Sequence, residues 1–369
     1  MEGKFKNRES KISPELLLKR YWPYLSVAVI IIVAISYGLF HYAITRGDDP
    51  EPDQNATTTT QIQEHEWDGL YDRQLDGFRV SEEEASLIPR AVMIENHVDA
   101  RPLSGVSKAS VVFEAPVEGG ITRMLVVFDA TTTVEKIGPV RSARPYFVEI
   151  AQALNAMYVH VGGSPEALNR IGGLSNFYNL DEMAGESYFW RASNRYAPHN
   201  AYTNSDNLNE AEQDKKWMAR KFTAWSFDDP ESNEFGDVRE VQIPYDGSYK
   251  VKWVFDERTG LYQRYLGGTI QKDLDGSFVT SKNIVVLESE QRVLDDYGRL
   301  FVRTTGEGKA WVYQNGYAQE GKWKRQSSNF FEILTPDDND ISLSRGNTWV
   351  EFATLEKYQP IEKVSSLDE

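Results

Sequence analysis

The chain has 369 residues, enough for about two domains, and its aromatic fraction of 12% argues against a disordered protein. It contains no cysteine, which excludes disulfides, thiol nucleophiles, thiolate metal sites and a lipid-modified cysteine. Its net charge of −16 argues against affinity for the phosphate backbone, so we expect no nucleic-acid partner.

The N-terminal region predicts a membrane anchor. Residues 1–20 carry six basic and three acidic side chains and form the predicted cytoplasmic tail. Residues 21–45 contain no Asp, Glu, Lys or Arg, and about 20 apolar residues suffice to span a bilayer as a helix. Because the basic flank is N-terminal, we expect a single-pass protein of the cell membrane with its C-terminal domains outside. The alternative is a cleaved signal peptide, whose apolar core would be unusually long.

An acidic, threonine-rich linker is predicted at 46–66, followed by an α/β domain at 67–220. Short runs rich in β-branched residues predict strands at 91–96, 109–115, 123–129 and 156–163. Helical spacing of apolar residues and helix-capping residues predict helices at 144–156, 164–171 and 206–218.

A mainly-β domain is predicted at 221–360, and residues 361–369 read as a tail. The pattern alternates with period two, and residues 249–268 predict a hairpin that turns at 256–260. Asn315-Gly316 predicts a type I′ turn between two further strands. The chain as a whole therefore predicts a mixed α+β fold behind one transmembrane helix.

Polar side chains gather in five stretches of the first domain, mostly where predicted strands end. Ligand sites in open α/β sheets form at such strand ends. The candidate binding residues are Glu95, His97, Arg101, Glu114, Glu118, Arg123, Arg141, Ser142, Arg144, His160, Ser164, His199 and Asn200.

Three kinds of catalytic or metal chemistry have candidate residues here, and each has a plainer structural alternative. His97, His160 and His199 offer three imidazoles for zinc, but they share no helix and no HExxH motif is present, so local pairing is the alternative. Ser164 precedes Pro165, which lacks the N–H an oxyanion hole needs, so we predict a helix cap. Paired carboxylates from Glu95, Glu114 and Glu118 could serve a glycosidase. We expect no cofactor, no metal and no catalytic residue.

Anion binding suits the arginines around residues 138–147, GPVRSARPYF, better than metal binding, a serine nucleophile or paired carboxylates suit this region. Guanidinium groups bind carboxylates and phosphates in bidentate fashion, and a helix start adds free N–H groups. We expect internal pairing of Arg123, Arg141 and Arg144 with the protein's own acids, and an external anion is the alternative. In the second domain, the aromatic side chains that alternate along the predicted strands are either core or a sugar-stacking surface.

The same stretches resemble a known family. AVMIENHVDARPLSGVSKASVVFEAPVEGGITRMLVVF, IGPVRSARPYFVEIA and YVHVGGSPEAL are similar to the N-terminal region of the YerB-like lipoproteins of bacteria, and GKWKRQSS and LSRGNTWVE to their C-terminal region. The resemblance covers about 87–354 and implies a two-domain extracytoplasmic protein of the bacterial envelope, from a family of unknown function. This chain departs from it by lacking the lipidated cysteine, so the predicted helix must tether it.

We therefore expect a non-catalytic module that binds an envelope polymer or an envelope protein. The first alternative is an envelope hydrolase that acts on glycan or peptide through paired carboxylates or a histidine-bound metal. The second is a structural scaffold without a small ligand.

Overall fold

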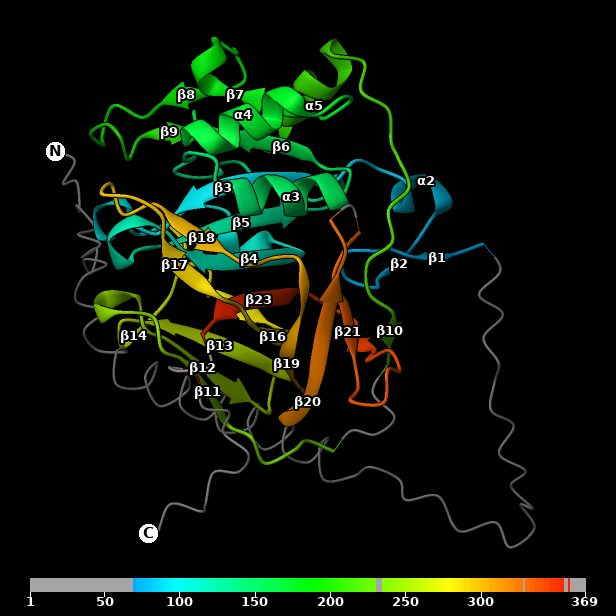
Figure 1. The fold of residues 1–369 in the computed structure, drawn as a ribbon. Helices are drawn as coiled ribbons and strands as arrows, with labels where there is room; N and C mark the ends of the chain where they lie inside the picture. The colour runs from blue at the N-terminus through cyan, green and yellow to red at the C-terminus, as the bar shows by residue number, and fades with distance from the viewer. Residues whose placement is uncertain (1–68, 230–233, 328, 355–357, 359–369) are drawn as a thin grey trace, which may run out of the picture. The chain divides into compact units, whose positions relative to one another are not determined.

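The computed structural model describes residues 69–229, 234–327, 329–354 and 358 (Figure 1). The predicted tail, anchor and linker at 1–66 and the C-terminal tail at 361–369 lie outside these residues. Within the part of the chain that is described, no helix combines the length and the apolar character needed to cross a membrane.

A ten-stranded mixed sheet runs through the molecule. In spatial order its strands are β21 (Glu332–Leu334), β20 (Tyr317–Arg325), β19 (Gly306–Gln314), β16 (Asn283–Glu288), β23 (Thr348–Ala353), β4 (Val111–Pro116), β5 (Thr122–Phe128), β3 (Arg90–Glu95), β6 (Met157–His160) and β7 (Asn179–Asp181). Figure 1 shows β23, near the C-terminus, lying between β16 and β4. The sheet thus joins both predicted domains, because β23 pairs in parallel with β4 from the first half.

The central strands largely share one direction. β16, β23, β4, β3, β6 and β7 are parallel to one another, and β5 runs antiparallel between β4 and β3. The carboxyl ends of the six parallel strands therefore lie along the same edge of the sheet, whereas the carboxyl end of β5 lies at the opposite edge. The confirmed class is a strand-rich mixed α+β fold.

A second, antiparallel sheet packs on one face of the first. It comprises β11 (Glu240–Ile243), β12 (Val251–Asp256), β13 (Leu261–Leu266), β14 (Thr269–Ile270) and β15 (Thr280–Ser281). Its buried residues, such as Trp253 and Tyr262, join one core with Val92, Ile94 and Val126 of the large sheet. The predicted hairpin over 249–268 is confirmed, since β12 and β13 pair across the turn at 256–260.

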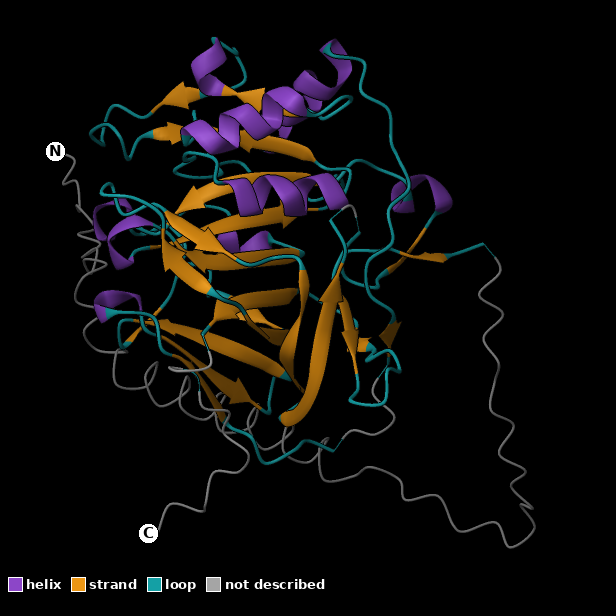
Figure 2. Ribbon diagram, in the orientation of Figure 1, coloured by secondary structure: helices purple, strands orange, loops and turns teal. Residues whose placement is uncertain are grey.

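The α-helices in the described part of the chain are α2 (Glu82–Ala85), α3 (Pro145–Ala153), α4 (Pro165–Gly173) and α5 (Ser205–Asp214). Figure 2 shows the longer ones gathered around the half of the sheet that holds β3, β6 and β7. Phe147 and Ile150 of α3 pack with Met93 and Leu125 in the core on the other face. The predicted cap at Ser164 is confirmed, since its hydroxyl accepts from the Ala167 N–H at 3.3 Å. Asn204 caps α5 and accepts from the Asn207 N–H at 2.8 Å.

Four further strand pairs occur among the residues that the structure describes. They are β1 (Tyr71–Asp72) with β2 (Arg79–Val80), β8 (Trp190–Arg191) with β9 (Ala201–Tyr202), β10 (Phe227–Asp228) with β22 (Leu343–Ser344), and β17 (Gln291–Val293) with β18 (Leu300–Val302). The predicted turn at Asn315-Gly316 connects β19 and β20, with φ of 53° and 75° as a type I′ turn requires.

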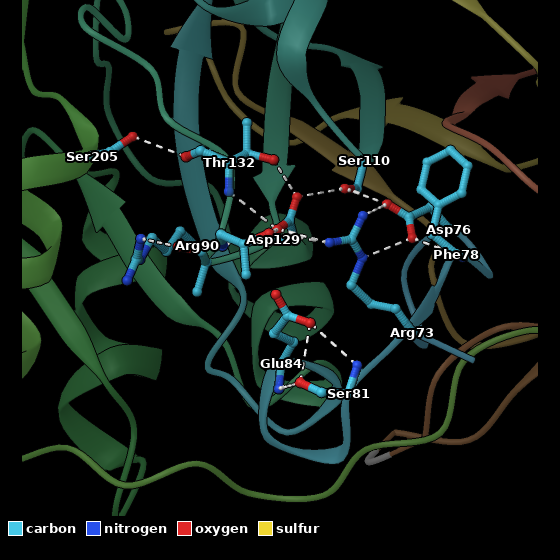
Figure 3. A network of polar contacts seen from close by, with 12 residues as sticks. Arg73, Asp76, Phe78, Ser81, Glu84, Arg90, Ser110, Asp129, Thr132 and Ser205 are labelled. Atoms are coloured by element: carbon cyan, nitrogen blue, oxygen red, sulfur yellow. Dashed lines mark hydrogen bonds and ion pairs between the residues drawn. The ribbon is translucent and has the colours of Figure 1, made fainter. Parts of the chain in front are cut away.

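The N-terminal strap, residues 71–86, is fixed to the sheet by the polar network in Figure 3. Arg73 contacts Asp76 at 2.7 Å and Asp129, just after β5, at 2.8 Å. The Ser110 hydroxyl, just before β4, donates to Asp76 at 2.8 Å. The network lies at the start of β4, at the edge of the sheet opposite the candidate site.

Candidate functional site

Two polar clusters lie at the carboxyl ends of the parallel strands, one on each face of the large sheet. Side chains alternate along a strand, so Glu95 and Arg123 share the face of Met93 and Leu125, which pack with helix α3. Glu114 and Thr122 share the face of Val112 and Met124, which belong to the core that includes the second sheet. We name these groups the helix-face cluster (Glu95, Glu118, Arg123, Arg141, Arg144) and the sheet-face cluster (Glu114, Arg264, Glu351 and their partners).

The loop 138–144 is inserted where β3 and β6 separate. The Arg141 N–H donates to the Met93 carbonyl at 2.8 Å, and the Val161 N–H donates to the Arg141 carbonyl at 3.1 Å. The Ala143 N–H donates to the Gly162 carbonyl at 2.9 Å. Backbone hydrogen bonds to both strands therefore place the arginines at the strand ends.

Two of the arginines of the helix-face cluster are paired internally. Arg144 forms a bidentate pair with Glu118 at 2.8 and 2.7 Å, and Arg141 lies 3.2 Å from Glu95. Burial alone would raise the pKa of Glu118, but the hydrogen bonds and charge of Arg144 outweigh it and lower that pKa. Internal pairing, the interpretation favoured from the sequence, accounts for these two arginines.

Arg123 is different. Its side chain is 7% exposed, its Nη1 donates to the Ser142 carbonyl at 2.9 Å, and its buried Nε has no partner. Among the described residues, no ion pair joins it to a carboxylate. Burial first, and then the charges of Arg144 and Arg141, lower its pKa to about 10, so it remains a cation at neutral pH. The cluster thus contains three guanidinium groups and two carboxyl groups, so its formal charge has an excess of one positive charge.

Two helices begin beside this charge. Helix α3 starts at Pro145, and Arg144 at its N-cap makes no side-chain cap. Helix α4 starts at Pro165, and the Ser164 N–H donates to the Ala143 carbonyl at 3.2 Å, so the two helix starts are adjacent. The N-terminus of a helix carries a partial positive charge, which favours anions and disfavours cations. The positive charges of the arginines therefore add to the partial positive charges of the two helix N-termini, and a bound anion would be stabilised by both.

The three candidate histidines do not lie together: His97 and His199 are neighbours, and His160 lies elsewhere. His160 is wholly buried, and its ring nitrogens lie 2.8 Å from the Gly162 carbonyl and 2.7 Å from Asn179 Oδ1, so both are engaged. His97 and His199 stack with ring centroids 4.9 Å apart. His199 Nδ1 lies 2.8 Å from Glu95 Oε2, the same oxygen that Arg141 approaches.

The sheet-face cluster is wholly buried. Glu114 Oε2 accepts from Arg264 Nη2 at 2.5 Å and from Trp349 Nε1 at 3.2 Å, and Glu351 Oε1 accepts from Trp253 Nε1 at 3.1 Å. The Tyr245 hydroxyl is 3.0 Å from Glu351 Oε2. Burial and the nearby Glu114 carboxylate raise the pKa of Glu351 to about 8.

Glu114 is among the residues predicted from the sequence, whereas Arg264 and Glu351 are not. A signal was present, because each charged residue stands at an apolar position of a buried strand: Arg264 between Tyr262 and Leu266 in LYQRYL, and Glu351 in TWVEFA. The predicted carboxylate set is divided: Glu114 belongs to the sheet-face cluster, and Glu95 and Glu118 pair with arginines on the helix face.

The other candidate residues have structural contacts. Arg101 donates to the Asn96 carbonyl at 2.9 Å and covers the Tyr249 ring, and Asn200 Oδ1 accepts from Arg191 at 3.1 Å. Ser142 contributes its carbonyl to Arg123 rather than its hydroxyl. Aromatic side chains of the predicted second domain belong to the core, since Trp253, Tyr262, Tyr313 and Trp323 are wholly buried.

A cavity of about 430 Å³ opens at the same edge of the sheet. It is lined by the β4–β5 loop on either side of Glu118, by the ends of β11 and β23, and by the β17–β18 hairpin. Both halves of the chain thus form its walls. Glu118 lies between the lining residues Val117 and Gly119 and forms an ion pair with Arg144. Chemically, this edge offers a concave surface beside a net positive cluster.

These features define a strand-rich α+β protein in which two regions of the sequence form one large sheet, with a polar cluster on each of its faces. Residues 75–218 match the family model "Protein of unknown function (DUF3048) N-terminal domain", and residues 241–350 match the corresponding C-terminal domain. The chain belongs to this DUF3048 family, which confirms the YerB-like resemblance.

Two comparisons support the assignment. The "Putative lipoprotein YerB" of Bacillus subtilis (strain 168) is 32% identical over 282 residues, which are 75% of this chain and 84% of the relative. The crystal structure of the YerB protein from Bacillus subtilis is similar with a TM-score of 0.69 and 29% sequence identity, covering 76% of this chain and 96% of that one.

Proposed function

We propose that this protein is a non-catalytic binding module of the bacterial envelope, and that the helix-face cluster binds an anionic group of its ligand or partner. The observation that carries the proposal is Arg123, a buried guanidinium without a carboxylate partner among the described residues. A buried cation is costly unless it is paired, and a carboxylate or phosphate would supply the missing charge.

The adjoining cavity supports this role. It lies at the carboxyl ends of β4 and β23, where ligands bind in related sheet architectures. An envelope polymer or protein could occupy it while an anionic group reaches the arginines. This arrangement requires no catalytic group, in keeping with the internal partners of Glu95 and Glu118.

The binding test is thermal unfolding of the full-length chain with and without inorganic phosphate or acetate. A ligand specific for the folded state at 100 times its Kd adds about 2.7 kcal/mol to the unfolding free energy. We expect a higher Tm for the wild type and no shift for Arg123→Met. Arg258→Met is the matched control, since Arg258 is an exposed arginine in the β12–β13 turn. Equal shifts in wild type and Arg123→Met, or no shift in either, would contradict the proposal.

We also propose that residues 21–45 tether the chain, with residues 46–369 outside the cell. The Bacillus subtilis relative is named a lipoprotein, whereas this chain has no cysteine to carry a lipid. Because the chain contains no other cysteine, labelling of a single introduced cysteine shows on which side of the membrane that residue lies. A membrane-impermeant maleimide should label Tyr297→Cys, at a site 82% exposed, in intact cells. It should label Lys6→Cys only after lysis; the reverse pattern would overturn the orientation.

A further inference from the structure

We propose that His97, His199 and Asp99 form a binding site for a divalent transition metal of the zinc type. Each residue can offer one ligand atom, and the three atoms lie within 4.8 Å of one another. Two imidazoles and one carboxylate suit a late first-row metal better than magnesium or calcium, which prefer oxygen ligands alone. Water would complete the shell, because Asp99 is 71% exposed and His97 is 32% exposed.

His199 is already oriented for ligation. Its Nδ1 lies 2.8 Å from Glu95 Oε2, and a carboxylate accepts only from a protonated nitrogen, so in the neutral ring with this tautomer Nε2 carries the free lone pair. Glu95 is itself held by Arg141 at 3.2 Å. A carboxylate behind a metal-bound imidazole is the usual outer contact of histidine sites, because it fixes the tautomer and the ring.

The two loops that carry the ligands are fastened together. Arg195, four residues before His199, donates to the Ala100 and Pro102 carbonyls at 2.6 and 2.9 Å, beyond His97 in the other loop. Arg101 in that loop donates to the Asn96 carbonyl at 2.9 Å. The backbone positions of the ligands are therefore set before any metal arrives, as a binding site requires.

One side chain must move. The His97 and His199 rings lie parallel within 18°, and His97 Nδ1 accepts from the Asp99 N–H at 3.2 Å. Metal binding would turn the partly exposed His97 ring out of this stack and release a long hydrogen bond. His160 stays outside the site, since both of its ring nitrogens are occupied.

The test uses the full-length chain, stripped with a chelator and titrated with Zn²⁺ by calorimetry and with Co²⁺ by visible absorption. We expect one site per chain in the wild type, and loss of that site in His199→Ala and in His97→Ala. The second variant changes a partly exposed loop residue, so it guards against a folding defect in the first. Glu95→Gln should bind about 10–100-fold more weakly while all three ligands remain.

The matched control is His65→Ala, which removes an imidazole from the predicted linker and should leave the site intact. Arg123→Met should also retain zinc binding, which separates this site from the anion site. The proposal is overturned if zinc binding persists unchanged in His97→Ala, if it depends on His65, or if the wild type takes up no metal.

Discussion

Glu114 and Glu351 are register partners on the adjacent parallel strands β4 and β23, and both side chains are wholly buried. Two carboxylates this close cannot both ionise cheaply, and Arg264 directly contacts Glu114. Glu351 therefore holds its proton, while the Tyr245 hydroxyl and the Trp253 indole surround it. Because β4 and β23 come from opposite ends of the described chain, this pair joins the two halves.

The first prediction concerns stability against pH. The folded-state pKa of Glu351 is about 8, above its ordinary 4.5, so the folded state holds a proton that the unfolded state releases. The contribution of this protonated carboxyl to the unfolding free energy is complete below about pH 4.5 and is lost as pH rises through 8. Between pH 6 and pH 8 we expect the unfolding free energy to fall by about 2 kcal/mol, measured by urea denaturation.

Glu351→Gln should remove this pH dependence, because the amide resembles the protonated acid in size and charge. Glu332→Gln, on an exposed position of β21, should keep the wild-type slope. An unchanged slope in Glu351→Gln would show that another group titrates.

The second prediction concerns the Arg144–Glu118 pair. The two side chains are 12% and 24% exposed and share two hydrogen bonds, so their coupling should exceed that of a surface ion pair. A double-mutant cycle with Arg144→Ala and Glu118→Ala should give about 1–3 kcal/mol. Because the pKa of Glu118 is lowered, the coupling should persist at neutral pH and vanish as pH falls through the folded-state value. A coupling energy near zero at pH 7 would contradict the prediction that this pair is stronger than a surface ion pair.

Local structure was predictable because its causes lie within a few residues. Ser164 and Pro165 define the start of α4, and Asn315-Gly316 fixes a hairpin through its positive φ angles. Strand ends rich in polar residues also predicted where the helix-face cluster forms.

Long-range pairing was not predictable. Nothing local in TWVEFA indicates that β23 lies beside β4, so the partners of Glu114 remained hidden. The unpaired state of Arg123 likewise depends on which acids other loops deliver, and Glu95 and Glu118 reach Arg141 and Arg144 instead.

The third prediction concerns the network in Figure 3. Asp76 and Asp129 are 2% and 5% exposed, and Arg73 contacts both. Removing one partner of a buried ion pair leaves an uncompensated charge, which costs about 3–5 kcal/mol. Arg73→Met should lower the unfolding free energy by that amount in chemical denaturation. Arg258→Met, in an exposed pair, should change it little, and similar effects from both variants would count against the burial argument.

The fourth prediction concerns Gly138, which opens the loop that carries the arginines. Its φ is +140°, and a Cβ there would meet the Val140 nitrogen at 2.8 Å and the Ala201 carbonyl oxygen at 2.9 Å. Both are backbone atoms joined by a 2.7 Å hydrogen bond, so neither can yield without moving the loop. Gly138→Ala should therefore cost more than about 1 kcal/mol of stability and also weaken anion binding.

Gly172 offers the matched comparison. It lies in helix α4, and a Cβ there meets nothing within 4 Å, so Gly172→Ala should stabilise by up to about 1 kcal/mol. Denaturation and phosphate-induced Tm shifts, measured on both variants, separate general stability from loop position. If Gly138→Ala matches Gly172→Ala in both measurements, the close packing at Gly138 does not position the arginines.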